Sequence, residues 1–249
     1  TFKIFYQNEN SYLLGGGFDT NQIIFAKRLP SYIDVKSGNV GIGYRFENTN
    51  YHFNPRHGNE IILSATAGIK KITKNNDIIN LKDPANPSFD FNSLYDSLKL
   101  KSYQAKVILS AAHYFPVGKS TVLKTALNGA LIQSPQLFQN ELYRIGGYQI
   151  LRGFDEESIY ANQYAVFTAE YRYLVGINSF FFGFSDAGIS KTKYQSYNYS
   201  NTYISAGIGL ELETKFGLLN LSYAIGKRND IKFDIRNASK IHFGYINYF

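Results

Sequence analysis

One arginine and two acidic residues are of types that could form an ion-pair cluster. Arg152 lies in a long polar segment, residues 133–162, and Glu170 and Asp186 lie in the two alternating apolar–polar segments that follow it. Counting along the alternation places both carboxylates on the polar face of neighbouring strands. A guanidinium group donates through a planar fork, so one arginine can bridge two such carboxylates. The alternative is that Arg152 lies at a solvated loop tip and that both acids are ordinary polar residues of their strands.

The other polar residues do not match a catalytic or metal-binding pattern. The four histidines, His52, His57, His113 and His242, are not spaced as paired metal ligands, and cysteine is absent. The sequence has no G-x-S-x-G nucleophile elbow and no P-loop. The acidic run at residues 155–157 lacks the spaced oxygen ligands of a calcium loop. We therefore expect no enzymatic activity, no metal and no cofactor.

The segments that carry the two acids show a strict two-residue repeat. The clearest example, from Tyr203, has one apolar face and one small or charged face: Ile204, Ala206, Ile208, Leu210 and Leu212 against Ser205, Gly207, Gly209, Glu211 and Glu213. The same pattern recurs in residues 59–72, 101–115, 163–175 and 218–226. Strands of soluble proteins average about 5–6 residues, whereas a tilted strand that crosses a bilayer needs about 9–11. The pattern predicts an all-β, antiparallel transmembrane barrel, in which lipid-facing and lumen-facing residues alternate.

The connections alternate between short and long. We predict eleven strands, at about residues 2–18, 21–29, 38–52, 59–72, 99–115, 120–132, 163–175, 177–190, 203–214, 217–226 and 238–249. Short turns are predicted at 19–21, 54–59, 117–120, 176–178 and 215–217, and long connections at 30–38, 73–98, 133–162, 191–202 and 227–238. Outer-membrane barrels have short periplasmic turns and long extracellular loops, so the long connections are expected outside the cell. Because bacterial barrels have even strand numbers, the odd count suggests that N-terminal strands are not part of this sequence.

Composition supports the same class. The chain has 21 Tyr and 20 Phe but no Trp, Met or Cys, and aromatic side chains suit a pleated surface. Its net charge of +7 comes from scattered Lys and Arg, which fits polar loops and membrane rims better than nucleic-acid binding. No run of 18 apolar residues is present, which excludes a transmembrane helix. A soluble β-sandwich remains the alternative.

The last ten residues, KIHFGYINYF, form an alternating strand that ends in an aromatic residue. Phe243, Tyr245 and Phe249 lie on one face of this strand. This ending resembles the C-terminal signal by which outer-membrane barrels are recognised for assembly.

The segment YRIGGYQILRGFDEE, residues 143–157, resembles the BamA/TamA superfamily of outer-membrane assembly and translocation proteins. Its members carry an Arg-Gly-Phe/Tyr motif, preceded by Val, Ile or Leu, in a long extracellular loop that folds back into the lumen. The matching residues here are Leu151, Arg152, Gly153 and Phe154, with Gly146 and Gly147 upstream. Residues 184–188, FSDAG, resemble the family's Phe-x-Asp-x-Gly strand motif and supply Asp186 and Gly188.

The resemblance implies how these residues act together. Loop 133–162 is expected inside the lumen, where an unpaired guanidinium group is costly and Arg152 needs Glu170 and Asp186 as partners. Gly153 is expected at a tight tip, and Phe154 as a wedge against the wall. Weaker similarities extend to residues 41–44, GIGY, and 54–58, NPRHG.

The resemblance also implies an overall organisation. Five strands follow the loop, as in the sixteen-stranded barrels of the family. Residues 1–249 are thus expected to form the C-terminal part of one barrel domain, with the periplasmic POTRA repeats and the first strands outside this sequence.

The implied function is an insertase or translocase in the outer membrane of a Gram-negative bacterium that assists the assembly of other β-barrels. Expected partners are outer-membrane lipid or lipopolysaccharide, client outer-membrane proteins, and periplasmic or lipoprotein accessory subunits; nucleic acid is not expected. Two alternatives stay open: a two-partner secretion transporter, or a barrel that anchors or exports an upstream catalytic domain. A passive porin is disfavoured because the loop motif has no purpose in a simple pore.

Overall fold

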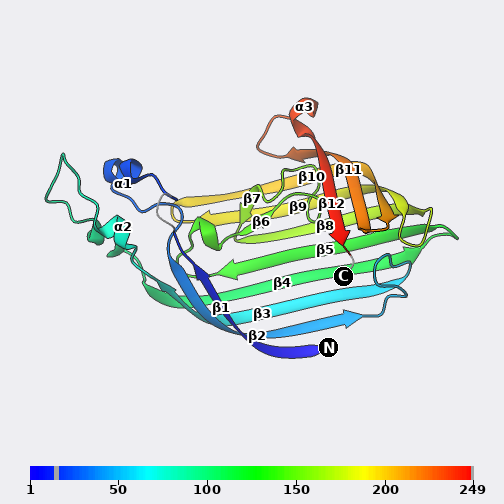
Figure 1. The fold of residues 1–249 in the computed structure, drawn as a ribbon, viewed down its shortest axis with the longest axis horizontal. Helices are drawn as coiled ribbons and strands as arrows, with labels where there is room; N and C mark the ends of the chain where they lie inside the picture. Colours follow the sequence, from blue (N-terminus) through cyan, green and yellow to red (C-terminus); the bar gives the residue numbers. More distant parts are fainter. Residues whose placement is uncertain (14–16, 248–249) are drawn as a thin grey trace.

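Ten long strands form one antiparallel sheet in the computed structural model, which describes residues 1–13 and 17–247. The strands are β1 (Phe2–Ser11), β2 (Val35–Glu47), β3 (Gly58–Ile72), β4 (Lys101–Pro116), β5 (Thr121–Gln133), β8 (Gln163–Leu174), β9 (Phe180–Tyr194), β10 (Tyr197–Thr214), β11 (Gly217–Arg228) and β12 (Ser239–Asn247). They follow one another in chain order, so that β1 and β12 are the two edges of the sheet. Figure 1 shows the sheet as a curved wall with a separate short pair, β6 (Tyr143–Ile145) and β7 (Ile159–Ala161), lying over it.

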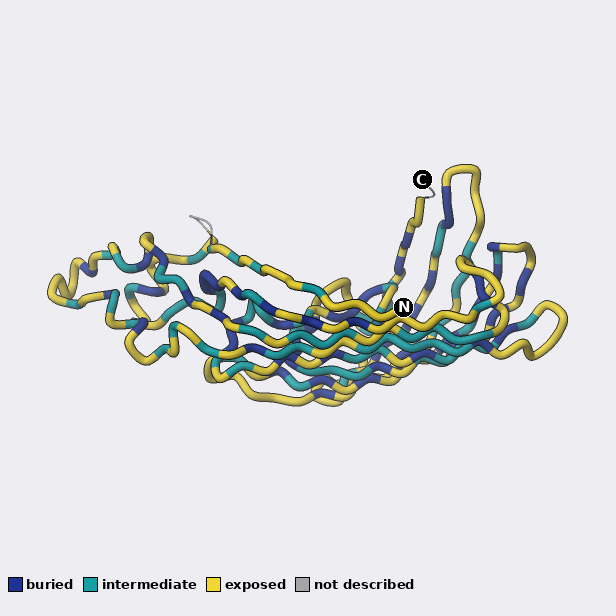
Figure 2. The backbone as a smooth tube through the Cα atoms, turned by 90° about the horizontal axis from the view of Figure 1, so that it is seen from below, coloured by how far each residue is buried: buried dark blue, intermediate teal, exposed yellow. Residues whose placement is uncertain are grey.

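Burial alternates along the strands, as the two-residue repeat predicts. On β9, for example, Phe182, Phe184 and Asp186 are buried, whereas Phe181 and Ile189 are about half exposed. We call the face that carries Asp186 the inner face and the opposite one the outer face. Figure 2 shows this alternation as bands of buried and exposed residues along the tube.

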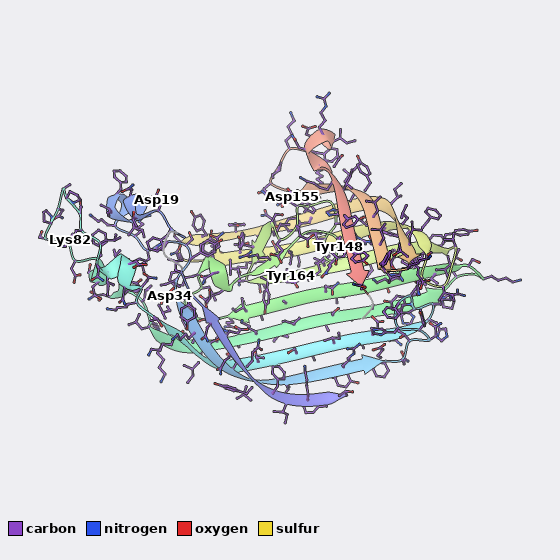
Figure 3. The ribbon with its side chains drawn as sticks, viewed as in Figure 1. Asp19, Asp34, Lys82, Tyr148, Asp155 and Tyr164 are labelled. Carbon is purple, nitrogen blue, oxygen red and sulfur yellow. The ribbon has the colours of Figure 1, made fainter. Side chains whose placement is uncertain are left out.

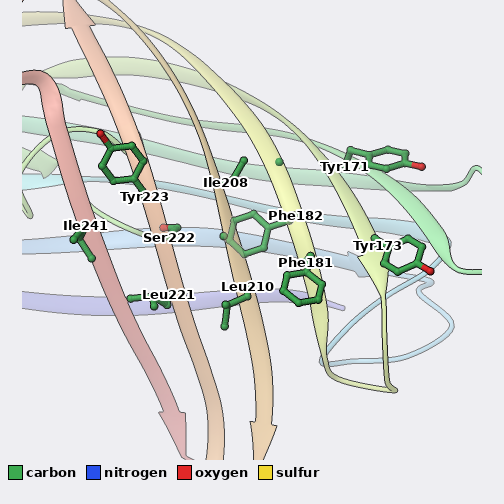
Figure 4. A pocket seen from close by; sticks show the side chains of 12 residues that line it. Tyr171, Tyr173, Phe181, Phe182, Ile208, Leu210, Leu221, Ser222, Tyr223 and Ile241 are labelled. Carbon is green, nitrogen blue, oxygen red and sulfur yellow. The ribbon is translucent and has the colours of Figure 1, made fainter. Parts of the chain in front are cut away.

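The outer face is apolar and exposed. Seven isoleucines from six strands are each more than half exposed: Ile4, Ile42, Ile69, Ile189, Ile204, Ile208 and Ile241. Over β8–β12 the same face has a hollow of about 620 Å³ lined by aromatic and aliphatic side chains, including Tyr171, Phe181 and Leu221 (Figure 4). A continuous apolar surface of this kind is unusual in water and suits contact with lipid. Most strands have 12 or more residues, which is enough to cross a bilayer at a tilt.

Short and long connections separate to opposite ends of the sheet. The turns 117–120, 175–179 and 215–216 and the connection 48–57 lie at one end, and the connections that precede β2, β4, β8 and β12 lie at the other. One predicted long loop, 191–202, is wrong. β9 continues to Tyr194 and β10 begins at Tyr197, because the two strands stay paired up to Tyr194 and Tyr197 and only a two-residue turn joins them.

The predicted strand at 21–29 is also wrong: this region contains helix α1 (Thr20–Ala26). The Asp19 side chain accepts hydrogen bonds from the N–H groups of Asn21 and Gln22 and so caps the helix. A short apolar run such as Ile23–Ala26 does not distinguish strand from helix by periodicity alone. Without this strand, the main sheet has ten strands and not eleven, and residues 19–21 are a helix start and not a hairpin turn.

The long connections pack against one another beyond the end of the sheet. Helix α1, helix α2 (Asn76–Ile79) and a 3₁₀ turn (Phe91–Tyr95) surround a small core of Ile23, Ile33, Ile78, Phe91, Tyr95 and Phe138. We call residues 17–34 and 73–100 the outer cap; Figure 1 shows α1 and α2 at that end, and Figure 3 marks Asp19 and Lys82 there. A third helix, α3 (Ile235–Ala238), precedes β12.

Among the described residues, no helix is long and apolar enough to cross a membrane. Phe249, part of the expected C-terminal signal, lies outside the described residues.

Candidate functional site

Loop 134–162 lies against the inner face of the sheet. The β6–β7 pair closes its base, and Thr192 of β9 donates to the Tyr160 carbonyl at 2.5 Å. Between β6 and β7 the chain runs across the inner face, so residues 146–158 approach β8 to β12 from inside the curve. Residues 146–158 therefore lie on the inner side of the curved sheet.

Arg152 joins the two acids that flank it on the inner face. Its Nε and Nη2 donate to the two carboxylate oxygens of Asp186 at 3.1 and 2.9 Å, and its Nη1 donates to Glu170 at 2.5 Å. Its backbone N–H also donates to Asp186 at 3.0 Å. Thr168 donates to the same carboxylate at 2.8 Å. Arg152, Glu170 and Asp186 are 8 %, 5 % and 0 % exposed, so this is a buried, hydrogen-bonded ion cluster.

The cluster continues into a second arginine that the sequence did not single out. Arg172, two residues along β8 from Glu170, donates from Nε to the Glu170 carboxylate at 2.9 Å. Its Nη1 donates to Asn54 at 3.0 Å, and Asn54 in turn donates to the Ile177 carbonyl at 2.9 Å. Two guanidinium groups thus match two carboxylates, which limits the cost of burying each charge. The signal was available, because Arg172 falls on the same face as Glu170 by the two-residue repeat.

Aromatic rings support both guanidinium groups. The Arg152 guanidinium carbon lies 3.4 Å from the Phe184 ring centroid, and that of Arg172 lies 4.5 Å from the Phe180 centroid. Such stacking adds to the charge pairing where water is excluded. Gly207 of β10 leaves room for this arrangement, since a Cβ there would lie 2.6 Å from the Phe184 ring.

The tip of the loop touches the wall backbone to backbone. Leu151 and Gly153 both have positive φ, 64° and 90°. A Cβ on Gly153 would lie 2.9 Å from the Gly226 nitrogen of β11. Phe154 packs edge-on against Tyr203 of β10, with ring centroids 5.3 Å apart. Gly153 is thus in close contact with the β11 backbone, and Phe154 packs against a ring of β10.

The tip also binds the edge strand β12. The Gly153 N–H donates to His242 Nε2 at 2.9 Å, which makes this nitrogen an acceptor and so requires the neutral ring tautomer with its proton on Nδ1. Lys240 pairs with Asp155 at 2.7 Å. Tyr148 packs over Gly244, where a Cβ would lie 2.7 Å from the ring; Figure 3 labels Tyr148 and Asp155 in this region. The sequence analysis did not single out His242, although its alternation with Ile241 and Phe243 puts it on the inner face.

A second buried ion pair holds the other end of the loop. Lys70 of β3 has a fully buried side chain and donates from Nζ to the Gln136 carbonyl at 2.5 Å and to both Glu141 carboxylate oxygens at 2.7 and 2.8 Å. The Phe138 N–H also donates to Glu141, at 2.9 Å. Sequence reasoning did not find this pair.

The remaining expected residues fall in three places. Gly146 and Gly147 have positive φ, 109° and 107°, where the loop turns before the tip. Gly188 lies beneath Leu151, and a Cβ there would lie 3.3 Å from the leucine side chain. Phe243 and Tyr245 point away from the ion cluster, on the outer face, and are 65 % and 46 % exposed.

A curved antiparallel sheet with an apolar outer face and a loop fixed on its inner face by buried ion pairs defines an outer-membrane-type β-barrel with an in-folded loop. Residues 33–245 match the model of the Omp85 superfamily domain, so the chain belongs to that superfamily. The resemblance to the BamA/TamA superfamily drawn from the sequence is thereby confirmed.

One similar solved structure is "The crystal structure of BamA from Haemophilus ducreyi lacking POTRA domains 1-3", at 18 % sequence identity and a TM-score of 0.59. The match covers 97 % of this chain and 49 % of that one, so the chain spans about half the length of that structure. The comparison confirms the predicted barrel fold. Comparison with curated protein sequences gave no match.

Proposed function

We propose that this chain forms the C-terminal part of an outer-membrane barrel that assists the insertion of other β-barrel proteins or the passage of polypeptides. Its membership of the Omp85 superfamily supports this role, and the apolar outer face supports a location in the outer membrane of a Gram-negative bacterium. The protein acts without enzymatic chemistry. Its partners are client outer-membrane proteins, accessory subunits and the surrounding lipid.

Residues 1–249 then form one part of a barrel domain whose first strands and POTRA repeats are supplied elsewhere. The in-folded loop 134–162 is the functional element of this part. Leu151, Arg152, Gly153 and Phe154 form its tip, Glu170 and Asp186 hold it, and Gly146, Gly147 and Gly188 shape its path. Phe243 and Tyr245, together with Phe249, serve as the recognition signal of the last strand.

The clasp of Arg152 by Glu170 and Asp186 carries the proposal. A buried guanidinium group with two carboxylate partners is costly to break, because removing one partner leaves the other charge uncompensated. The loop is therefore held in one position while its tip bonds to the edge strand β12. A loop fixed in this way stabilises the barrel conformation that inserts client proteins or lets polypeptides pass.

Replacing either end of the clasp tests this role. Arg152→Ala and Asp186→Ala each leave an unpaired buried charge, and we expect the folded state to lose about 3–5 kcal/mol. In proteoliposomes of the purified protein, insertion of a client barrel should fall at least several-fold, and protease should cut the loop faster.

Arg144→Ala is the matched control. This arginine lies in the same loop, but its pair with Glu157 is long, 3.5 Å, and both side chains are about half exposed or more. We expect client insertion to stay near the parent level, since exposed pairs contribute at most about 1 kcal/mol. Normal insertion and an unchanged proteolysis pattern in both clasp variants would refute the proposed role.

A further inference from the structure

A basic groove lies at the end of the sheet that carries the long connections. It has a volume of about 1010 Å³ and is walled by the ends of β5, β8 and β9, by residues of the outer cap within 27–29 and 93–98, and by residues 134–138 and 162 of the loop. Lys191 and Lys193 of β9 line it. They lie on the outer face, because Ser190 and Thr192, which alternate with them, are buried on the inner face. Both lysine side chains therefore enter the groove from the outer face of the sheet.

Three of the four cations of this groove form no ion pair within residues 1–13 and 17–247. Lys27, Arg28, Lys191 and Lys193 line it, and no Asp or Glu among the described residues does. Lys27 pairs with Asp83 of the outer cap. Within residues 1–13 and 17–247, Arg28, Lys191 and Lys193 form no ion pair. Like charges gathered in this way favour an anionic ligand.

An apolar groove continues directly from the basic one. It has a volume of about 690 Å³ and is lined on the outer face by Val107, Leu109, Leu131, Ala165 and Ile189. The two grooves share Leu131, Gln163 and Lys191. These three residues form one row across β5, β8 and β9, since Leu131 is paired with Gln163 and Gln163 with Lys191. The small residues Gly129 and Ala165 keep the apolar groove open.

We propose that the joined grooves bind one anionic membrane lipid, with its phosphorylated headgroup against Arg28, Lys191 and Lys193 and an acyl chain along Val107, Leu131 and Ile189. The inference rests on the proposed outer-membrane location and adds a specific lipid site to it. Charge complementarity selects the headgroup, and the apolar groove explains why the ligand is a lipid and not a soluble anion. The hollow over β8–β12 in Figure 4 does not compete for such a headgroup, because no charged residue lines it.

The test compares two double variants of the purified protein in phosphatidylcholine nanodiscs doped with diphosphorylated lipid A. Bound lipid is counted by native mass spectrometry. Lys191→Gln with Lys193→Gln should weaken lipid A binding roughly twenty-five-fold, because each cation near an anionic headgroup contributes a factor of about five. Lys119→Gln with Lys215→Gln removes the same charge from exposed turns at the opposite end of the sheet and should leave binding unchanged.

A third variant tests the apolar groove without changing charge. Ala165→Phe fills the groove with a ring and should lower lipid A retention while the heat-modifiable mobility of the folded protein stays normal. Full retention in the Lys191/Lys193 variant, equal retention of a lipid A without phosphates, or displacement of lipid A by inorganic phosphate alone would each overturn the proposal.

Failure of the lipid site and failure of the membrane location give different results. If the parent protein does not float with phosphatidylcholine vesicles in a density gradient, the location itself is wrong. If it floats but shows no preference for phosphorylated lipid, only the lipid site is wrong.

Discussion

At the scale of single residues, the two sets of ion pairs that hold the loop differ in how well the sequence predicts them. Arg152 lies in a recognisable motif, and the two-residue repeat places Glu170 and Asp186 on one face of adjacent strands, so their meeting could be expected. Lys70 also falls on the polar face of its strand, but nothing local marks it as buried. Its partner Glu141 is 71 residues away and outside any strand. Long-range contacts between a strand and an irregular loop have no periodic signal, and this pair could not be predicted.

Lys70 offers a test of how strongly the base of the loop is held. Lys70→Met leaves the Glu141 carboxylate buried without its cation, and we expect a loss of about 3–5 kcal/mol in unfolding free energy. Adding Glu141→Gln should recover a large part of the lost unfolding free energy, because it removes the unpaired buried charge. Denaturant unfolding of the purified protein, together with the rate of chymotryptic cleavage within 134–142, provides the measurement.

The neighbouring Lys71→Met is the control for Lys70. Lys71 is exposed on the same strand, and its substitution should change stability by no more than about 0.5 kcal/mol. Equal effects of the two methionine variants would mean that the buried pair does not anchor the loop.

At the scale of elements, the loop tip depends on a glycine in a strand. A Cβ on Gly226 of β11 would lie 2.5 Å from the Gly153 carbonyl oxygen and 2.9 Å from the Phe154 ring. Gly226→Ala should therefore push the tip from the wall and cost about 1–3 kcal/mol, as overpacking does. Faster proteolysis of residues 146–158 would report the displacement.

Gly183→Ala is the control, because it adds the same methyl group to a glycine of another strand. Gly183 lies on β9, where a Cβ would meet its nearest atom at 4.0 Å, so the methyl group has space. We expect stability equal to or slightly above that of the parent protein. A stable, protease-resistant Gly226→Ala protein would contradict the close packing at the tip.

The outer cap responds to acid through one carboxylate. The hydrogen bond from Lys27, and then the N–H of Ala85, hold the pKa of Asp83 below its ordinary value. A folded-state pKa below the unfolded value of about 3.9 means that this stabilisation is complete well above pH 4 and is lost as the pH falls through the lower folded value.

The protection factors of residues 76–96 in hydrogen exchange, corrected for the intrinsic exchange rate at each pH, should thus fall at acidic pH in the parent protein. Lys27→Gln removes the donor, so these protection factors should be lower near neutral pH and should change less on acidification. An identical acid response in both proteins would show that another group controls the cap.

At the scale of the whole molecule, strands were far easier to predict than the cap. Nine of the eleven predicted strands correspond to single strands of the sheet with shifts at their ends, and the first, 2–18, is confirmed only over Phe2–Ser11. The failure at 21–29 has a physical reason. A short apolar run takes its conformation from its surroundings, here the Asp19 cap and the burial of Ile23 in the outer cap. The two-residue repeat is instead imposed by the two faces of the sheet, and it is visible without tertiary information.

The loop connects strands that are far apart in the sheet. Lys70 lies on β3 and His242 on β12, the third and tenth strands in order, and both bind loop 134–162. Hydrogen bonds between neighbouring strands fix their spacing but leave the bend between them adjustable. The loop therefore fixes the distance between β3 and β12 across the curved sheet, and with it the width of the interior, independently of strand pairing. Conditions that screen or protonate its anchors should widen or narrow the interior while every strand keeps its neighbour.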